Sequence, residues 1–286
     1  MLDKNCLLTG ATSGIGQAAA IALAKEGYRL FLVARNPTRA SATEQLIRLK
    51  AKDAEVHWLM GDLASLVDVR NIAETFLSFD CKLDLLFLNA GVTYNRRTCS
   101  QDGYEMMFAV NHLAPFTLTH LLMDKLVEGN HDTRVVITAS GAYSFVNGLN
   151  IDDLNAEKKY SSIKAYGHSK LANILFTHSL DERLHSAVTT KHISVNCFHP
   201  GFVGTNLGTQ TPLGKTIMRL IKPFSRSSAK GADTGLFLAL EEFIENSGGY
   251  YFNRKKKQLP FYAKDPEAAK ALWEQSCRLA GLTPID

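Results

Sequence analysis

Short apolar runs alternate with longer helical patterns from the N-terminus to about residue 200, and this alternation constrains the fold most strongly. The runs are continuous rather than alternating in polarity, as expected of strands that helices cover on both faces. We expect strands at Leu7–Thr9, Leu30–Ala34, Val56–Met60, Leu83–Leu88, Val135–Thr138 and Ile193–Phe198. We expect helices over Gly14–Lys25, Pro37–Lys50, Asp68–Phe79, Tyr104–Leu126 and Tyr166–Leu184. This order predicts an α/β fold, a Rossmann-type doubly wound parallel sheet in a single domain over residues 1–286.

The bulk composition is that of an ordinary globular protein. Hydrophobic residues make up 45% of the chain and charged residues 21%, which argues against disorder. A net charge of +4, from 32 basic and 28 acidic residues, gives no case for a nucleic-acid partner. We interpret the densest basic run, Arg254–Lys257, as a solvated turn after a strand, with an anionic surface or partner as the alternative.

The cysteines and the hydropathy pattern indicate the environment. The five cysteines are scattered without CxxC spacing, so neither a metal site nor a disulfide framework is indicated. We therefore expect a reducing, cytoplasmic environment. No stretch of eighteen apolar residues occurs, and we expect a soluble protein without a transmembrane anchor.

Two long segments interrupt the alternation. Gly141–Ala165 connects a strand to a helix, and Asn206–Ser228 follows the sixth strand. Connections of this length in a compact domain are commonly functional, and in an open α/β sheet ligands bind beyond the carboxyl ends of the strands. We expect a substrate lid at about residues 206–228.

A glycine-rich loop, Thr9–Gly16, lies between the first strand and the first helix. Glycines allow a tight turn and a close approach of the backbone to a pyrophosphate, which the N–H groups and the positive helix end then hold. The position of the loop at a strand-to-helix junction favours dinucleotide binding, and a turn that serves only packing is the alternative. Its expected cofactor-binding residues are Gly10, Thr12, Ser13, Gly14, Ile15 and Gly16.

The end of the second strand indicates which dinucleotide binds. An acidic residue there favours the free ribose hydroxyl of NAD, whereas arginine favours the 2′-phosphate of NADP. The strand ends with Arg35, and no acidic residue follows before Glu44. The sequence therefore predicts NADP(H), with NAD(H) less favoured; a surface arginine that caps the next helix is the alternative.

Tyr166 and Lys170 form a YxxxK pair on a predicted helix. Residues four apart share one face, so the phenol and the ammonium point the same way. A free phenol has a pKa near 10, and a neighbouring cation lowers it toward the range useful for acid–base catalysis. The spacing is common by itself, and an ordinary surface helix is the alternative.

Together and in this order, these motifs resemble those of the short-chain dehydrogenases/reductases, from about residue 4 to about residue 280. The resemblance implies catalytic roles for Asn111, Ser140, Tyr166 and Lys170. It adds cofactor contacts by Asp62, Leu63, Asn89, Ala90, Gly91, Tyr166, Lys170, Pro200, Val203 and Thr205.

Within that family, the chain is most similar to the retinol-dehydrogenase-like branch. The similarity lies in the connection Ile151–Ser161, the string Tyr166–Phe176 and the tail Leu272–Ser276. The departures from the branch pattern argue against assuming a retinoid substrate; they are Thr12, Gln17, Ala139 and Gly204.

The resemblance implies hydride transfer between the nicotinamide and a carbonyl or alcohol carbon. Ser140 would hydrogen-bond the substrate oxygen and Tyr166 would deliver the proton. Lys170 would hold the nicotinamide ribose and lower the pKa of the phenol, and Asn111 would anchor a water that leads to Lys170. The alternatives are a helix-interior amide bonded only to backbone for Asn111 and a strand-end cap for Ser140.

The long segments are expected to form the substrate pocket, whose candidate walls are Tyr143, Phe145, Val146, Phe202 and Leu207. Apolar walls favour a hydrophobic aldehyde or ketone. The basic, amphipathic stretch Leu213–Lys222 is interpreted as a lid helix, with peripheral contact to a membrane as the alternative. We interpret two histidines and three apolar residues as structural: His168, His199, Met106, Met107 and Phe108.

Two other functions stay open: a catalytically silent NADP-binding scaffold, and a reductase of a conjugated C=C bond. A silent scaffold would normally have lost the tyrosine or the lysine. The resemblance also implies a homodimer paired through the helix that carries the YxxxK motif.

Overall fold

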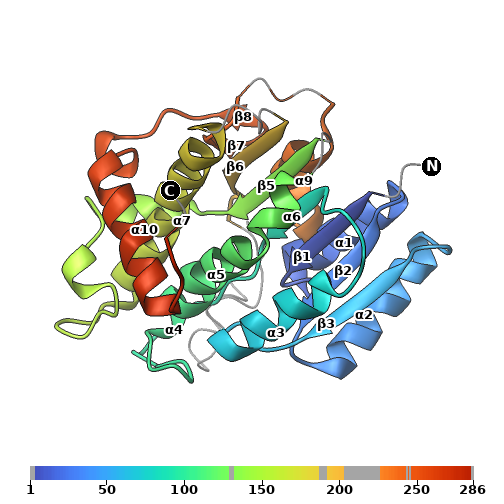
Figure 1. Ribbon diagram of the computed structural model, residues 1–286, viewed down its shortest axis with the longest axis horizontal. Helices are drawn as coiled ribbons and strands as arrows, with labels where there is room; N and C mark the ends of the chain where they lie inside the picture. Colours follow the sequence, from blue (N-terminus) through green and yellow to red (C-terminus); the bar gives the residue numbers. More distant parts are fainter. Residues whose placement is uncertain are drawn as a thin grey trace.

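Eight strands form one sheet in the computed structural model, which describes residues 4–128, 132–186, 192–202, 226–242, 244 and 246–284 (Figure 1). The strands are β1 (Asn5–Thr9), β2 (Arg29–Ala34), β3 (Val56–Met60), β4 (Leu85–Leu88), β5 (Thr133–Thr138), β6 (Ile193–His199), β7 (Gly249–Phe252) and β8 (Lys255–Lys256). Their order is β3-β2-β1-β4-β5-β6-β7-β8; neighbours from β3 to β7 pair in parallel and β8 is antiparallel to β7. The predicted doubly wound sheet is confirmed, and its order reverses between β1 and β4, where such sheets bind ligands.

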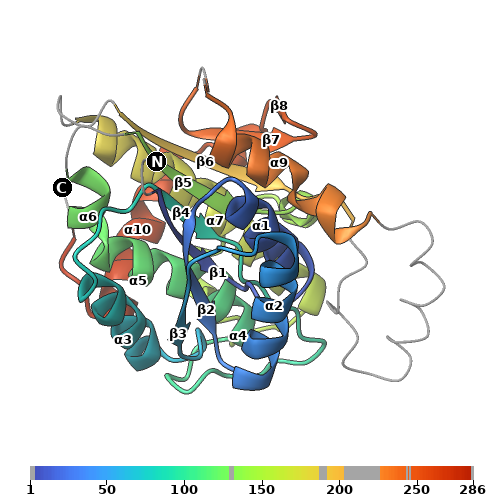
Figure 2. The same ribbon diagram turned by 90° about the vertical axis from the view of Figure 1, so that its right-hand side faces the viewer.

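Helices cover both faces of the sheet (Figures 1 and 2). One face carries α1 (Gly14–Lys25), α2 (Pro37–Lys50) and α9 (Ser228–Leu240). The other carries α3 (Leu66–Leu77), α5 (Ala114–Leu121), α6 (Met123–Val127), α7 (Ser162–Ser186) and α10 (Pro266–Ala280). Because successive strand side chains point to opposite faces, each central strand contributes to both cores. This double coverage explains the uninterrupted apolar runs.

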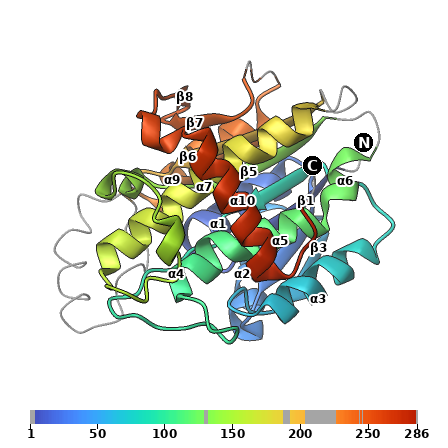
Figure 3. The same cartoon turned by 60° about the vertical axis from the view of Figure 1, so that its left-hand side comes forward.

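The C-terminal helix α10 lies across α5 and α7 (Figure 3). Its Leu272, Trp273 and Cys277 are buried, and the Arg183 guanidinium of α7 lies 4.2 Å from the centroid of the Trp273 ring. The helix ends at Gly281 in the left-handed conformation, which glycine adopts without strain. One side of α5 and α7 is therefore covered by the chain itself.

The helix predicted over Tyr104–Leu126 is wrong as one continuous element. It divides into α4 (Met106–Phe108), a π-helical turn over Ala109–Leu113, α5 and α6. Pro115 lies in the first turn of α5 and has no N–H to donate to the carbonyl of Asn111, four residues earlier. The regular α-helical bond is therefore absent there, and Asn111 lies in the widened turn.

The basic run Arg254–Lys257 was predicted to be a turn, and only its first residue lies in one. The turn after β7 is formed by Asn253 and Arg254, whose φ angles are 53° and 60°. Positive φ at both positions suits a two-residue hairpin turn, so Lys255 and Lys256 belong to β8 instead. Exposed lysines on a short edge strand also discourage pairing with another chain.

Candidate active site

The glycine loop between β1 and α1 is shaped for a close ligand. A Cβ at Gly16 would lie 2.2 Å from the carbonyl oxygen of Gly10, and Gly10 itself has φ +71°. Ser13 caps α1 without a side-chain hydrogen bond, and the first turn of α1 contains no acidic residue. The first N–H groups of α1 thus have no side-chain acceptor from the cap, which is the condition for binding an anion.

Asn89 and Ala90 tie the end of β4 to this loop. The Thr9 hydroxyl accepts from the backbone N–H groups of Asn89 and Ala90, each at 3.0 Å. The Asn89 amide donates to the carbonyl of Thr9 at 3.1 Å. These bonds hold the carboxyl ends of β1 and β4 together, on the two sides of the point where the strand order reverses.

A cavity of about 350 Å³ extends from this loop to Tyr166 and Lys170. The residues predicted to bind the cofactor that line it are Gly10, Thr12, Ser13, Gly14, Ile15, Gly16, Arg35, Asp62, Leu63, Asn89, Ala90, Gly91, Tyr166, Lys170 and Pro200. Val203 and Thr205 lie outside the described residues. The cavity thus gathers chain segments from the ends of six strands, β1 to β6.

Arg35 lies where the cavity meets the end of β2. Its Nη1 is 3.0 Å from Oδ2 of Asp62, and the two side chains are 61% and 30% exposed. An exposed ion pair of this kind contributes little stability, so Arg35 can exchange Asp62 for another anion. The cap of α2 is Asn36, which accepts from the N–H of Arg39, and Arg35 does not fill that position.

Arg39 also lines the cavity and was not predicted. It lies in the first turn of α2, four residues after Arg35. The sequence could have indicated this residue, because a helix that starts at Pro37 places Arg39 in its first turn, close to Arg35.

Ser140 and Tyr166 interact at the carboxyl end of β5. The Ser140 hydroxyl accepts from the N–H of Ala142 at 3.1 Å and so caps the 3-10 turn Gly141–Phe145. Burial raises the pKa of Tyr166, and a hydrogen bond with Ser140 acts in the opposite direction. The net shift in the protein alone is therefore upward rather than the expected lowering, because desolvation outweighs the hydrogen bond with Ser140. The role predicted for Lys170 stays a prediction.

The ammonium of Lys170 lies over the Tyr166 ring and is hydrogen-bonded to the backbone at the end of β5. It donates to the carbonyl of Thr138 at 3.0 Å and lies 5.9 Å from the centroid of the Tyr166 ring. The side chain is 2% exposed, and burial lowers the pKa of Lys170 to about 8. The lysine thus lies near the midpoint of its titration at mildly alkaline pH.

Asn111 holds the loop after β4. Its amide donates to the carbonyl of Val92 and to the Ser169 hydroxyl, both at 3.0 Å, and accepts from the N–H of Val92 at 2.7 Å. It is therefore not bonded only to backbone. A Cβ at Gly91 would lie 3.4 Å from Nζ of Lys170 and 3.5 Å from Oδ1 of Asn111, so both polar groups face this one glycine.

The apolar walls of the cavity differ from the candidates. Val146 is buried in the core, Tyr143 packs against Tyr250 and Tyr262, and neither lines the cavity. Phe145 and Phe202 are 56% and 52% exposed and lie outside its wall, and Leu207 is outside the described residues. The observed apolar lining includes Val92, Tyr94, Met106 and Val110.

Met106 is the clearest correction in this wall. The structural interpretation fits Met107 and Phe108, which are buried, but it is wrong for Met106, which lines the cavity. The short α4 followed by the π-helical turn directs adjacent residues to different surroundings. A continuous helical pattern could not show this.

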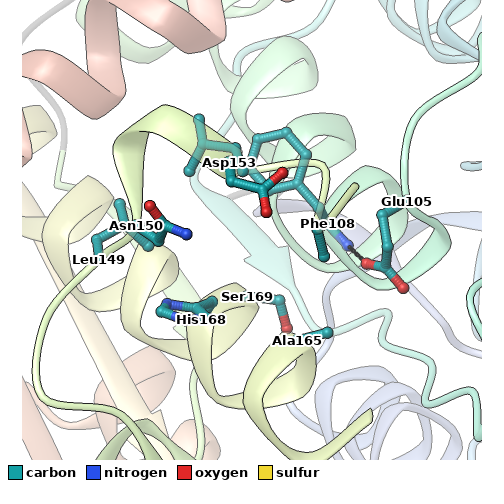
Figure 4. Close-up of a pocket in the computed structure, with 10 residues that line it drawn as sticks. Glu105, Phe108, Leu149, Asn150, Asp153, Ala165, His168 and Ser169 are labelled. Carbon is teal, nitrogen blue, oxygen red and sulfur yellow. Dashed lines mark hydrogen bonds between the residues drawn. The ribbon is translucent and has the colours of Figure 1, made fainter. Parts of the chain in front are cut away.

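His168 lines a second, separate pocket beside α7 (Figure 4). This pocket of about 20 Å³ is large enough for one water, which needs about 10–15 Å³. Among the described residues, Nδ1 of His168 has no hydrogen-bond partner, whereas the Glu105 carboxylate interacts with Tyr160. His168 therefore belongs to the packing beneath the Gly141–Ala165 connection rather than to the main cavity.

His199 packs at the end of β6. Its ring stacks on Phe252 with centroids 4.9 Å apart, and Nδ1 accepts from the N–H of Gly201. Burial and the nearby Arg226 lower the pKa of His199 to about 4, so the imidazole is neutral near pH 7.

Comparison with known proteins agrees with this architecture. The family model described as short chain dehydrogenase matches residues 4–215. Mouse retinol dehydrogenase 12 is 36% identical over 98% of this chain and 87% of its own. A putative daunorubicin C-13 ketoreductase from Streptomyces sp. (strain C5) is 38% identical over 98% of this chain and 93% of its own. A crystal structure of a putative uncharacterized protein from Mycobacterium paratuberculosis has a TM-score of 0.77 and 30% identity, and covers 99% of this chain and 95% of its own.

The chain belongs to the short-chain dehydrogenase/reductase family and is retinol-dehydrogenase-like. Members of this family are oxidoreductases that bind a nicotinamide cofactor.

The residues that the structure describes contain no group of three or more His, Cys, Asp and Glu side chains placed to hold a metal ion. No helix within them combines the length and the apolar character needed to span a bilayer.

Proposed function

We propose that this protein is an NADP(H)-preferring oxidoreductase that interconverts a lipophilic aldehyde or ketone with its alcohol. The observation that carries the proposal is that the glycine loop, Arg35, Tyr166 and Lys170 all line one cavity. The relatives named retinol dehydrogenase and ketoreductase support this class of reaction.

The glycine loop between β1 and α1 fits a dinucleotide. Gly10 and Gly16 leave no room for a side chain, and the first turn of α1 offers N–H groups to a pyrophosphate. Pro200, with Val203 and Thr205 beyond the described part, would hold the carboxamide. A nicotinamide cofactor, when bound, supplies or accepts the hydride.

The residues of this chain would manage the proton and the developing charge. During reduction the substrate oxygen becomes negative, and Ser140 and Tyr166 would each donate a hydrogen bond to it before the phenol releases its proton. The raised pKa of Tyr166 keeps the phenol protonated at neutral pH, which suits this direction. Lys170 would stabilise the resulting phenolate, and Asn111 would hold the loop that faces Lys170.

Two arginines support the preference for NADP(H). Arg35 and Arg39 line the same end of the cavity, and a guanidinium binds a phosphate through paired hydrogen bonds. Within the part of the chain that the structure describes, Asp62 is the partner that Arg35 would release, and that pair is exposed. The apolar wall of Val92, Met106 and Val110 supports a lipophilic substrate.

Thermal unfolding and turnover test the proposal together. NADPH should raise the melting temperature more than NADH does at equal concentration. The wild type should oxidise NADPH with members of a panel of hydrophobic aldehydes and ketones, while Tyr166→Phe keeps the thermal shift and loses at least about 100-fold in kcat. Conjugated enones in the panel, with product analysis, distinguish C=O from C=C reduction. A wild type stabilised by NADPH but inactive on the whole panel would instead support the silent scaffold.

A further inference from the structure

A buried polar network lies behind Lys170, between the π-helical turn, α7 and α10. Its three side chains are His112, Asn173 and Ser276, which are 0%, 2% and 0% exposed. None of them lines the cofactor cavity. Polar groups this deep are expected to be fully hydrogen-bonded, so their arrangement is informative.

Asn173 and Lys170 share one acceptor. The carbonyl of Thr138, at the end of β5, accepts from Nζ of Lys170 at 3.0 Å and from Nδ2 of Asn173 at 3.3 Å. A carbonyl oxygen has two lone pairs and can serve both donors. Because Asn173 is three residues after Lys170, both side chains lie on the same face of α7. The amide therefore helps to set where the ammonium is held.

His112 connects this amide to α10. Nε2 of His112 lies 2.9 Å from the Ser276 hydroxyl. Within the described part of the chain, Nδ1 of His112 and Oδ1 of Asn173 are buried without a hydrogen-bond partner that meets strict geometry. Burial lowers the pKa of His112 to about 3, and a hydrogen bond with the Asn173 side chain acts in the opposite direction. An amide oxygen that accepts from an imidazole N–H has this effect, because it favours the protonated ring.

A neutral imidazole has one donor and one acceptor, which restricts the network to one pattern. If Nδ1 carries the proton and faces the Asn173 oxygen, Nε2 must accept from Ser276. The amide nitrogen of Asn173 is then directed at the carbonyl of Thr138, as observed. With the other tautomer, an unprotonated Nδ1 would face an amide oxygen, which is repulsive.

We propose that Asn173 is a positioning residue for Lys170, oriented by His112 and Ser276, so that the packing of α10 orders the lysine. The proposal rests on the function proposed for Lys170. Loss of this network would let Thr138 and the ammonium shift. The phenol of Tyr166 would then lose part of its neighbouring positive charge, and its ionisation would move to higher pH.

The tautomer of His112 can be measured without any turnover. Long-range ¹H–¹⁵N spectra of histidine side chains distinguish Nδ1–H from Nε2–H. The signal of His112 is assigned because it disappears in His112→Gln and shifts in Ser276→Ala. We expect Nδ1–H and no titration between about pH 5 and 9. An Nε2–H tautomer, or an imidazole that titrates near its usual pKa of about 6.5, overturns the network.

Kinetics then test the positioning role. Asn173→Leu removes the amide at similar size, and Ser276→Ala removes the distal hydroxyl. Each should raise the apparent pKa in the pH profile of alcohol oxidation by about 0.5 unit or more and lower kcat at neutral pH at least about threefold. The affinity for NADPH, measured by nicotinamide fluorescence, should change less than about twofold.

Ser179→Ala is the matched control, because Ser179 is also buried on α7 but outside the network. It should leave the pH profile unchanged even if the melting temperature falls. If Asn173→Leu and Ser276→Ala both show the pH profile of the wild type, after correction for the folded fraction, the positioning role is overturned. An inactive wild type with the expected His112 tautomer would instead remove the proposed function and leave the network intact.

Discussion

Lys170 combines deep burial with a charge that the proposed mechanism uses. Burial lowers its pKa to about 8 from an ordinary value of 10.5, so the folded state binds this proton less tightly than the unfolded state. The difference corresponds to about 3 kcal/mol of destabilisation at neutral pH. This cost is fully present below about pH 8 and fades as the pH rises toward 10.5, where the unfolded lysine also loses its proton.

Replacing this lysine should therefore stabilise the fold while removing function. We expect Lys170→Met to raise the free energy of unfolding by up to about 3 kcal/mol at pH 7, less what is lost with the bond to Thr138. The gain over wild type should shrink between about pH 8 and 10. Urea unfolding of both proteins at pH 7 and 9.5 measures this difference; an equal gain at both pH values would contradict the assignment of the cost to ionisation.

Arg35 should determine which dinucleotide binds. Loss of a charge-assisted contact costs about 1.5–3 kcal/mol, so Arg35→Ser should weaken NADPH binding about 10- to 100-fold and NADH binding less than about twofold. Arg48→Ser is the matched control, because Arg48 lies on the adjoining helix α2, is also exposed and pairs with Glu44 instead. Fluorescence titrations with both cofactors measure the ratio. Equal weakening of the two cofactors would show that Arg35 does not contact a 2′-phosphate.

At the scale of secondary-structure elements, the turn from β1 into α1 is packed against β4 with little free space. A Cβ at Gly16 would lie 2.2 Å from the Gly10 carbonyl and 2.5 Å from the Asn89 amide. The clash is with backbone as well as side chain, so the loop itself must move. The same loop carries the N–H groups that would bind a pyrophosphate.

Gly16→Ala should therefore lower cofactor affinity beyond its effect on stability. We expect the thermal shift with NADPH to disappear at concentrations that saturate the wild type. Gly27→Ala is the control at the other end of α1: it meets nothing within 4 Å, but its φ of +78° makes alanine unfavourable. The control should lose stability and keep the shift. A normal NADPH shift in Gly16→Ala would remove the close-approach argument.

At the scale of the whole molecule, α10 decides which surface is open to other chains. It packs across α5 and α7 through Leu272 and Trp273, and the resemblance had implied pairing through the helix that carries Tyr166 and Lys170. A second copy cannot use the part of that face where α10 lies. Displacing the helix would expose a buried tryptophan and several aliphatic side chains, at a cost of several kcal/mol.

We therefore expect a monomer of 31.5 kDa at micromolar concentration, measured by size-exclusion chromatography with light scattering. A dimer whose crosslinks join α5 or α7 of one copy to the same helices of the other would contradict this steric argument. A dimer crosslinked elsewhere would leave the argument about this face intact.

The sequence by itself determined the order of strands and helices up to about residue 200, except for the division of the helix predicted over Tyr104–Leu126, and the positions of the residues with special chemistry; β8, α9 and α10 lay outside that prediction. A glycine turn after a strand, or a tyrosine four residues before a lysine, is a local pattern, because a few neighbouring residues control backbone conformation and helix facing. The bounds of α1 and α2 were predicted to the residue, since glycine, asparagine and proline mark their starts.

Only the tertiary structure decided how these residues behave. It buried Tyr166 and so raised the pKa of the phenol, whereas the Tyr–Lys spacing alone had suggested a lower pKa. It also directed the ammonium of Lys170 to the carbonyl of Thr138. It also brought Met106 to the cavity and α10 onto α7. Desolvation and packing depend on side chains brought together from distant parts of the chain, and no local pattern contains that information.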